Sequence, residues 1–83
     1  MSIGAEEFEK HKNPLKYTVE FLRTNRDNAF TIESIAKAIN MDVSEVKNAL
    51  FYDTLASILD PRYGSLIDSA TVRGVIYYKY KGQ

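Results

Sequence analysis

The sequence predicts one small α+β domain, in which three helices are followed by a two-stranded β-hairpin. Two helical patterns separated by a short polar break occupy residues 32–50, and another helical pattern begins at Asn13-Pro14. Apolar residues in these patterns recur at intervals of three and four, as they do on one face of an amphipathic helix. Runs of β-branched and aromatic residues then dominate residues 65–80, which is typical of strands.

The composition limits both the size of the core and the possible chemistry. The 83 residues are 45% apolar and 27% charged, which fits one folded domain with one core. The chain has no cysteine and one histidine, which excludes disulfides, thiolate chemistry and the usual zinc sites. We expect no enzyme activity, no cofactor and no small-molecule ligand. No apolar run approaches the roughly 20 residues that cross a bilayer, so we expect a cytoplasmic protein without a membrane partner.

The division of the chain follows from the start signal at Asn13-Pro14. Residues 13–83 are predicted to form the domain, because asparagine can cap a helix and proline is well suited to its first position. Residues 1–12 are predicted to be an N-terminal arm that frays, forms a short helix or packs across a partner subunit, and a frayed end is the default. His11 lies between two lysines, so we expect a solvated side chain there.

The first predicted helix ends in the turn-rich residues 24–28. Its buried stripe is expected to contain Leu15, Val19 and Leu22. Ala29-Phe30 then forms a short extended piece, where the small sheet could gain a third strand.

The middle of the sequence contains two helices that meet at a tight corner. Thr31 is the predicted N-cap of the first, and Asn40 ends it because asparagine tolerates the left-handed conformation. Asp42 caps the second helix, with Glu45 able to reach back to its amide. Met41 is expected to plug the corner. The residues predicted to face the core are Ile32, Ile35, Ala36, Ile39, Val43, Val46 and Leu50.

After residue 50 the apolar stripe shifts by one position. Phe51, Leu55, Ile58 and Leu59 continue at helical spacing, while Asp53 takes a place on the earlier stripe. Either the helix bends near Asp53 or its two faces serve different neighbours. Asp60-Pro61 ends the helix, and strands are predicted at 65–68 and 74–80, joined by the polar residues 69–73.

These elements together resemble a known family. The residues Ile35-Ala36, Ile39-Asn40-Met41, Val46 and Ala49 fall where the helix-turn-helix pattern has its small residue, turn and core positions. Asn40 departs from the glycine most often seen in that turn. With a hairpin after the third helix, residues 13–80 are similar to the winged-helix family, and in particular to its small transcriptional regulators of the prokaryotic and archaeal type.

The resemblance implies binding to double-stranded DNA, with the third helix in the major groove and the hairpin on the flanking backbone or minor groove. The residues that the resemblance assigns to DNA contact are Ser44, Lys47, Asn48, Tyr52, Arg73 and Lys37. Ser44 and Lys47 suit phosphate, and Asn48 can present a donor and an acceptor to adenine. Asp42 and Glu45 at the same helix end would repel phosphate. The alternative is a winged-helix module that binds proteins without DNA, which fits the formal net charge of zero.

The aromatic content predicts a partner as well. The second strand places Val75 and Tyr77 on one side and Ile76, Tyr78 and Tyr80 on the other. A chain of this length has one core in which to bury such side chains, and uncovered apolar patches mark interfaces. We therefore expect a homodimer.

Overall fold

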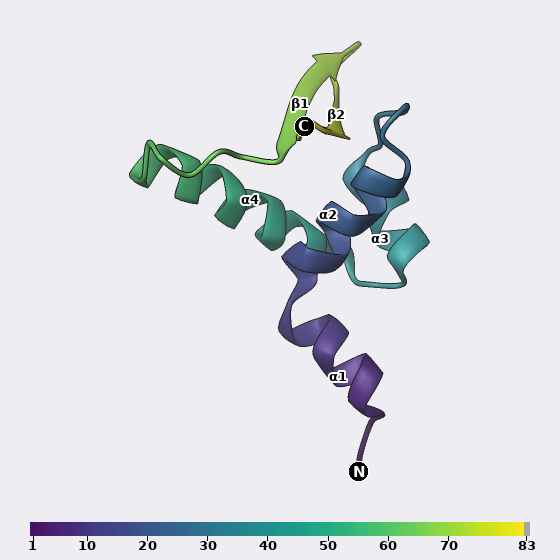
Figure 1. The fold of residues 1–83 in the computed structure, drawn as a ribbon. Coiled ribbons are helices and arrows are strands. Elements are labelled where there is room, and N and C mark those ends of the chain that lie inside the picture. The colour runs from purple at the N-terminus through teal and green to yellow at the C-terminus, as the bar shows by residue number, and fades with distance from the viewer. Residues whose placement is uncertain (83) are drawn as a thin grey trace.

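The computed structural model describes residues 1–82, in which four helices precede one antiparallel β-hairpin (Figure 1). The elements are α1 Ala5–Lys12, α2 Pro14–Thr24, α3 Ile32–Ile39, α4 Val43–Leu59, β1 Ile67–Val72 and β2 Val75–Tyr80. The structure confirms the α+β order, and it adds a helix within the N-terminal arm. Gln83, the last residue of the predicted domain 13–83, lies outside the described residues.

Side-chain and backbone caps fix the ends of the helices where the sequence predicted them. Three amides at helix starts donate to side-chain oxygens: Lys16 to Asn13 Oδ1 (3.4 Å), Ser34 to Thr31 Oγ1 (3.2 Å) and Asp42 to Glu45 Oε1 (3.4 Å). Asn40 ends α3 in the left-handed region, with φ 56° and ψ 53°. The next amide, that of Met41, donates to the Ala36 carbonyl at 2.9 Å. The corner between α3 and α4 is therefore held by the backbone itself.

The core lies where α2, α3 and α4 meet. Its buried apolar residues are Leu22, Ile35, Ala36, Met41, Val46 and Leu50. Met41 is 8% exposed, which confirms the predicted plug at the corner. Val43 was predicted to face this core and is 44% exposed, so that prediction is wrong. It is the first residue of α4, and the contacts at this end of the core are made by Met41 and Val46.

The hairpin turns through two residues rather than five. Val72 pairs with Val75, and the intervening Arg73 and Gly74 have φ angles of 53° and 79°. Positive φ at both central residues is the pattern of a type I′ turn, whose twist matches that of the strands. The predicted strand at 65–68 and connection at 69–73 are therefore wrong. The polar residues of that segment belong to β1, because one face of the hairpin is open to solvent.

The extended piece before α3 joins the sheet, as predicted. Phe30 forms a single antiparallel bridge with Tyr78 of β2. The Phe30 amide donates to the Tyr78 carbonyl at 2.8 Å, and the Tyr78 amide donates back at 2.7 Å. Phe30 also meets Phe21 of α2 edge to face, with ring centroids 4.9 Å apart. This bridge fastens the hairpin to the helical core.

Helix α4 is continuous through Asp53, and its two faces differ in burial. Asp53 is 2% exposed, and its carboxylate accepts hydrogen bonds from the Tyr63 hydroxyl (2.8 Å) and the Ser65 hydroxyl. The bond to Asp53 raises the pKa of the Tyr63 hydroxyl. On the other face of α4, Ile58 and Leu59 are 69% and 73% exposed. The described residues provide no neighbour for that face, so a second neighbour for α4 stays a prediction. The buried Asp53 carboxylate anchors the loop between α4 and β1.

The N-terminal segment extends away from the body of the molecule. In Figure 1, α1 continues below the start of α2, on the side away from the hairpin. None of its residues is buried. Within the described residues, the structure contains no helix that is both long enough and apolar enough to cross a membrane.

Candidate nucleic-acid interface

The first two turns of α4 present an exposed polar face. Ser44, Lys47 and Asn48 are all exposed, and their spacing of three and four places them on one side of the helix. The opposite side is fixed in the core through Val46 and Leu50, which are 0% and 4% exposed. The core therefore holds this polar face in one orientation relative to α2 and α3.

A groove runs beside this face, between α4 and the junction of α1 with α2. Its volume is about 360 Å³. The lining residues are His11, Lys12, Asn13, Pro14, Leu15, Glu45, Asn48, Ala49 and Tyr52. The structure thus brings two of the predicted contact residues, Asn48 and Tyr52, into one concave surface. Lys12 also lines this groove, although the sequence predicted that it belongs to a separate N-terminal arm.

His11 connects α1 to the start of α4. Its Nδ1 lies 2.7 Å from Glu45 Oε2, and its Nε2 lies 2.9 Å from Glu7 Oε2. Carboxylates only accept hydrogen bonds, so both contacts are satisfied together when both ring nitrogens carry protons. The bonds to Glu45 and Glu7 accordingly raise the pKa of His11 above 6.5. His11 is exposed, as predicted, but the prediction missed that its ring is paired with two carboxylates.

One of the two contacts of His11 could be predicted from the sequence, and the other could not. Glu7 precedes His11 by four residues, which is the spacing of neighbours on a helix face. Glu45 is 34 residues away, and only the fold brings it to the ring. One consequence is electrostatic: the cationic form of His11 offsets the charge of Glu45, one of the two acids expected to repel phosphate at this end of α4.

The remaining predicted contact residues lie elsewhere on the surface. Lys37 is exposed in the last turn of α3, and Arg73 is exposed at the hairpin turn. The hairpin packs against α2, and its turn stands away from the first two turns of α4 (Figure 1). The structure therefore gathers Ser44, Lys47, Asn48 and Tyr52 on α4 and leaves Arg73 apart from them.

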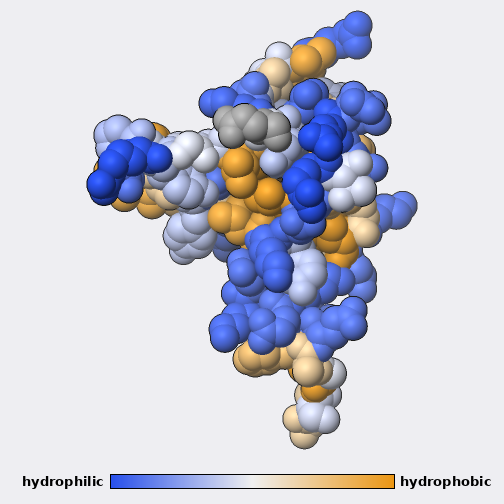
Figure 2. Space-filling view, viewed as in Figure 1, coloured by the Kyte–Doolittle hydropathy of each residue, from blue (hydrophilic) through white to orange (hydrophobic). Residues whose placement is uncertain are grey.

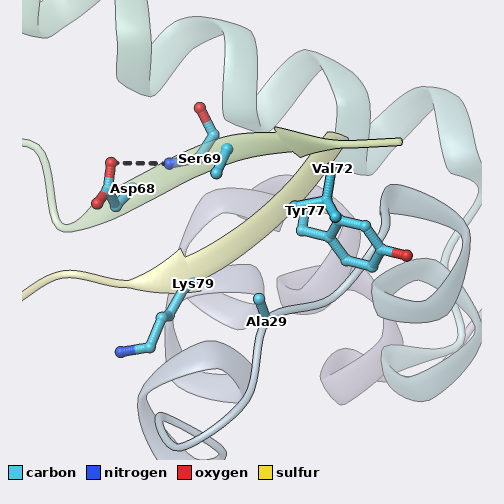
Figure 3. Close-up of a pocket in the computed structure, with 7 residues that line it drawn as sticks. Ala29, Asp68, Ser69, Val72, Tyr77 and Lys79 are labelled. Carbon is cyan, nitrogen blue, oxygen red and sulfur yellow. Dashed lines mark hydrogen bonds between the residues drawn. The ribbon is translucent and has the colours of Figure 1, made fainter. Parts of the chain in front are cut away.

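A second hollow lies on the outer face of the hairpin. It has a volume of about 380 Å³ and is lined by Ala29, Asp68, Ser69, Ala70, Val72, Tyr77 and Lys79. Figure 3 shows Val72 and the Tyr77 ring lying together, while the Lys79 ammonium points away from them. This hollow is mainly apolar and separate from the polar face of α4.

Neither a metal-binding cluster nor a similar known protein assigns a function to this surface. Among residues 1–82, no three His, Asp or Glu side chains are placed to hold a metal ion. Comparisons with protein-family models, curated proteins and solved structures found no match to the chain.

Proposed function

We propose that the protein is a winged-helix transcriptional regulator that binds double-stranded DNA with the first two turns of α4. One observation carries the proposal: Ser44, Lys47 and Asn48 form an exposed face on a helix whose other side is fixed in the core. A major groove about 12 Å wide admits one helix, and it selects for side chains that are presented in this way.

The side chains of this face suit different parts of DNA: Ser44 and Lys47 suit the phosphates, and Asn48 suits a base. Ser44 and the free amides of the first turn can donate to a phosphate, and Lys47 can neutralise one. Asn48, one turn in from the helix start, can form two hydrogen bonds with an adenine edge. Tyr52 and Lys12 continue the surface along the groove, where an aromatic hydroxyl and an ammonium can contact the sugar-phosphate backbone.

The hairpin and α3 supply secondary contacts in this proposal. Arg73 would meet the flanking backbone or minor groove, where arginine is attracted by the negative potential of a narrow groove. Lys37 would meet a phosphate beside the corner. Both side chains are exposed and free to reach a duplex that extends past α4.

The test is fluorescence anisotropy with random-sequence duplex DNA, titrated from low to physiological salt. We expect salt-sensitive binding, with the slope of log K against log salt reduced by about one in Lys47→Ala. Arg26→Ala is the matched control because it removes the same charge from an exposed site after the far end of α2. Equal slopes for Lys47→Ala and wild type would exclude the polar face of α4 from the contact.

Sequence preference is tested separately, on an operator obtained by selection from a random pool. Asn48→Ala should relax the sequence preference, with a loss of discrimination of about 1–3 kcal/mol at the one base pair that Asn48 contacts. Unchanged preference would show that Asn48 reads no base.

A second candidate function is binding of a protein without DNA. It is favoured by the apolar hollow on the hairpin and by exposed apolar side chains at its turn, where Val72, Val75 and Ile76 are 43–49% exposed. Absence of DNA binding even at low salt would favour this second function.

A further inference from the structure

Helix α1 is joined to the body of the molecule by few contacts. A single non-helical residue, Asn13, separates α1 from α2, with φ −134° and ψ 65°. No residue of α1 is buried, and Phe8, its only aromatic residue, is 54% exposed. On the face shown in Figure 2, hydrophilic side chains lie between the apolar patch of the body and the N-terminal tip. Apolar burial therefore contributes little to the position of α1, and Asn13 is a hinge at which it can pivot.

One side-chain contact ties α1 to α4. Within the described residues, the bond between His11 Nδ1 and Glu45 Oε2 (2.7 Å) is the only side-chain hydrogen bond between these two helices. Glu45 is itself held in place, because its Oε1 accepts from the Asp42 amide at the start of α4. The other ring nitrogen of His11 lies 2.9 Å from Glu7 Oε2, one turn earlier in α1. The ring therefore lies between a carboxylate of the body and a carboxylate of its own helix.

The charge of His11 decides whether both contacts can form. A neutral imidazole has one N–H and one lone pair, so it donates to one carboxylate and turns its lone pair towards the other. The cationic ring donates to both. A helix of eight residues is marginal by itself, so α1 depends on the pair of Glu7 with His11 as well as on the contact with Glu45.

We propose that His11 is a pH-dependent clasp, which holds α1 against α4 when the ring is charged and releases α1 when the ring is neutral. The hydrogen bonds to Glu45 and Glu7 raise the pKa of His11 above 6.5. The clasp is therefore closed below pH 6.5 and opens as the pH rises through the folded-state pKa.

The charged and ionisable groups around the ring come from α1 and from the start of α4. Those that bond to the ring, flank it in the chain, line its groove or contact Glu45 are Glu7, Lys10, Lys12, Asp42, Glu45 and Tyr52. Of these, only the two glutamates form hydrogen bonds with the ring in the described part of the chain. Helix α2 contributes the uncharged Pro14 and Leu15 to the same groove.

Pulsed electron paramagnetic resonance between two spin labels tests the clasp. The chain has no cysteine, so Ala5→Cys and Ile58→Cys place one label on each helix. At about pH 5.5 and low salt, we expect one narrow distance distribution. At about pH 8.5 the distribution should broaden, and the ratio of clasped to released molecules should fall about threefold or more, because each of two exposed ion pairs shifts an equilibrium by up to about fivefold.

Two variants show whether His11 causes this response. His11→Gln removes the titrating group and should give the same distribution at both pH values. Glu9→Gln is the matched control, because it removes an exposed acid of the same helix that does not contact the ring, and it should respond like wild type. A wild-type distribution that does not change with pH, or an equal change in His11→Gln, would overturn the clasp.

The consequence for DNA rests on the proposed function. Opening the clasp leaves the charge of Glu45 without its counter-charge and takes Lys12 away from Asn48, so affinity for a duplex should fall about threefold between pH 6 and pH 8 at constant salt. Glu45→Gln should lose most of this response. A full response in Glu45→Gln would mean that the ring acts on DNA directly, and it would overturn this link. Absence of any DNA binding would refute the proposed function, while the label distances would still decide the clasp.

Discussion

Removal of the Asp53 carboxylate should destabilise the fold strongly, although the residue is remote from the polar face of α4. Asp53 is 2% exposed and holds the hydroxyls of Tyr63 and Ser65, which tie the loop after α4 back to the helix. In Asp53→Ala both hydroxyls lose this acceptor. Ser65 retains its bond to the Ile67 carbonyl at 3.0 Å, whereas Tyr63 is 37% exposed and can turn towards water.

The magnitude follows from these two bonds. Hydrogen bonds to charged groups each contribute about 1.5–3 kcal/mol, and the partial exposure of Tyr63 places its bond at or below the lower end. We expect a loss of about 2–4 kcal/mol in the free energy of unfolding. An 83-residue domain has roughly 4–12 kcal/mol in total. One substitution therefore removes a large fraction of the stability.

Urea unfolding followed by circular dichroism measures this loss. With a slope of about 1 kcal/mol per molar urea, the midpoint of Asp53→Ala should fall by roughly 2–4 M. Tyr63→Phe should lose about 0.5–1.5 kcal/mol, since it breaks one bond. Thr54→Ala, at the neighbouring exposed position, should change little. If Asp53→Ala unfolded within about 0.5 kcal/mol of wild type, the buried carboxylate would not be the anchor of this loop.

Three further predictions follow from single contacts. The bonds to Glu45 and Glu7 raise the pKa of His11, so the contribution of His11 to the free energy of unfolding is complete below pH 6.5 and is lost as the pH rises through the folded-state pKa. NMR titration of His11 should show a pKa above 6.5, and Glu45→Gln should lower this pKa. Gly74→Ala should cost about 1–2 kcal/mol in urea unfolding, because φ is +79° there while the added Cβ meets no atom within 4 Å. Thr18→Val should stabilise the protein by about 1 kcal/mol in the same assay, because the buried Thr18 hydroxyl has no hydrogen-bond partner among residues 1–82; no gain would show that the hydroxyl is satisfied in solution.

The helix ends could be predicted from the sequence because they depend on neighbouring residues. Asn13-Pro14 fixes the start of α2, and Asn40 ends α3, because each acts on neighbouring backbone groups. The hairpin turn was missed because arginine at positive φ lacks the Asn-Gly or Asp-Gly signature of a type I′ turn. The polar residues of β1 then resembled a loop, although alternation on a half-exposed sheet predicts such residues equally well.

The candidate site divides in the same way. The polar face of Ser44, Lys47 and Asn48 could be predicted, since helical spacing alone places these residues together. The groove beside it could not, because Lys12 and His11 reach α4 only when α1 turns at Asn13. The position of Arg73 also depends on how the hairpin packs, and its packing on α2 is set by the Phe30–Tyr78 bridge.

The sequence by itself determined the order of α2, α3, α4 and the hairpin, the caps and the core of Leu22, Ile35 and Val46, because short-range hydrogen bonds and hydrophobic periodicity act within a few residues. Only the tertiary structure decided which side of α4 is covered after residue 50. There the buried Asp53 faces its loop, and Ile58 and Leu59 are left exposed to solvent. Hydropathy alone predicts that Asp53 is exposed and that Ile58 and Leu59 are buried. The burial of a charged group depends on hydrogen-bond donors, and only the folded chain brings these donors to Asp53.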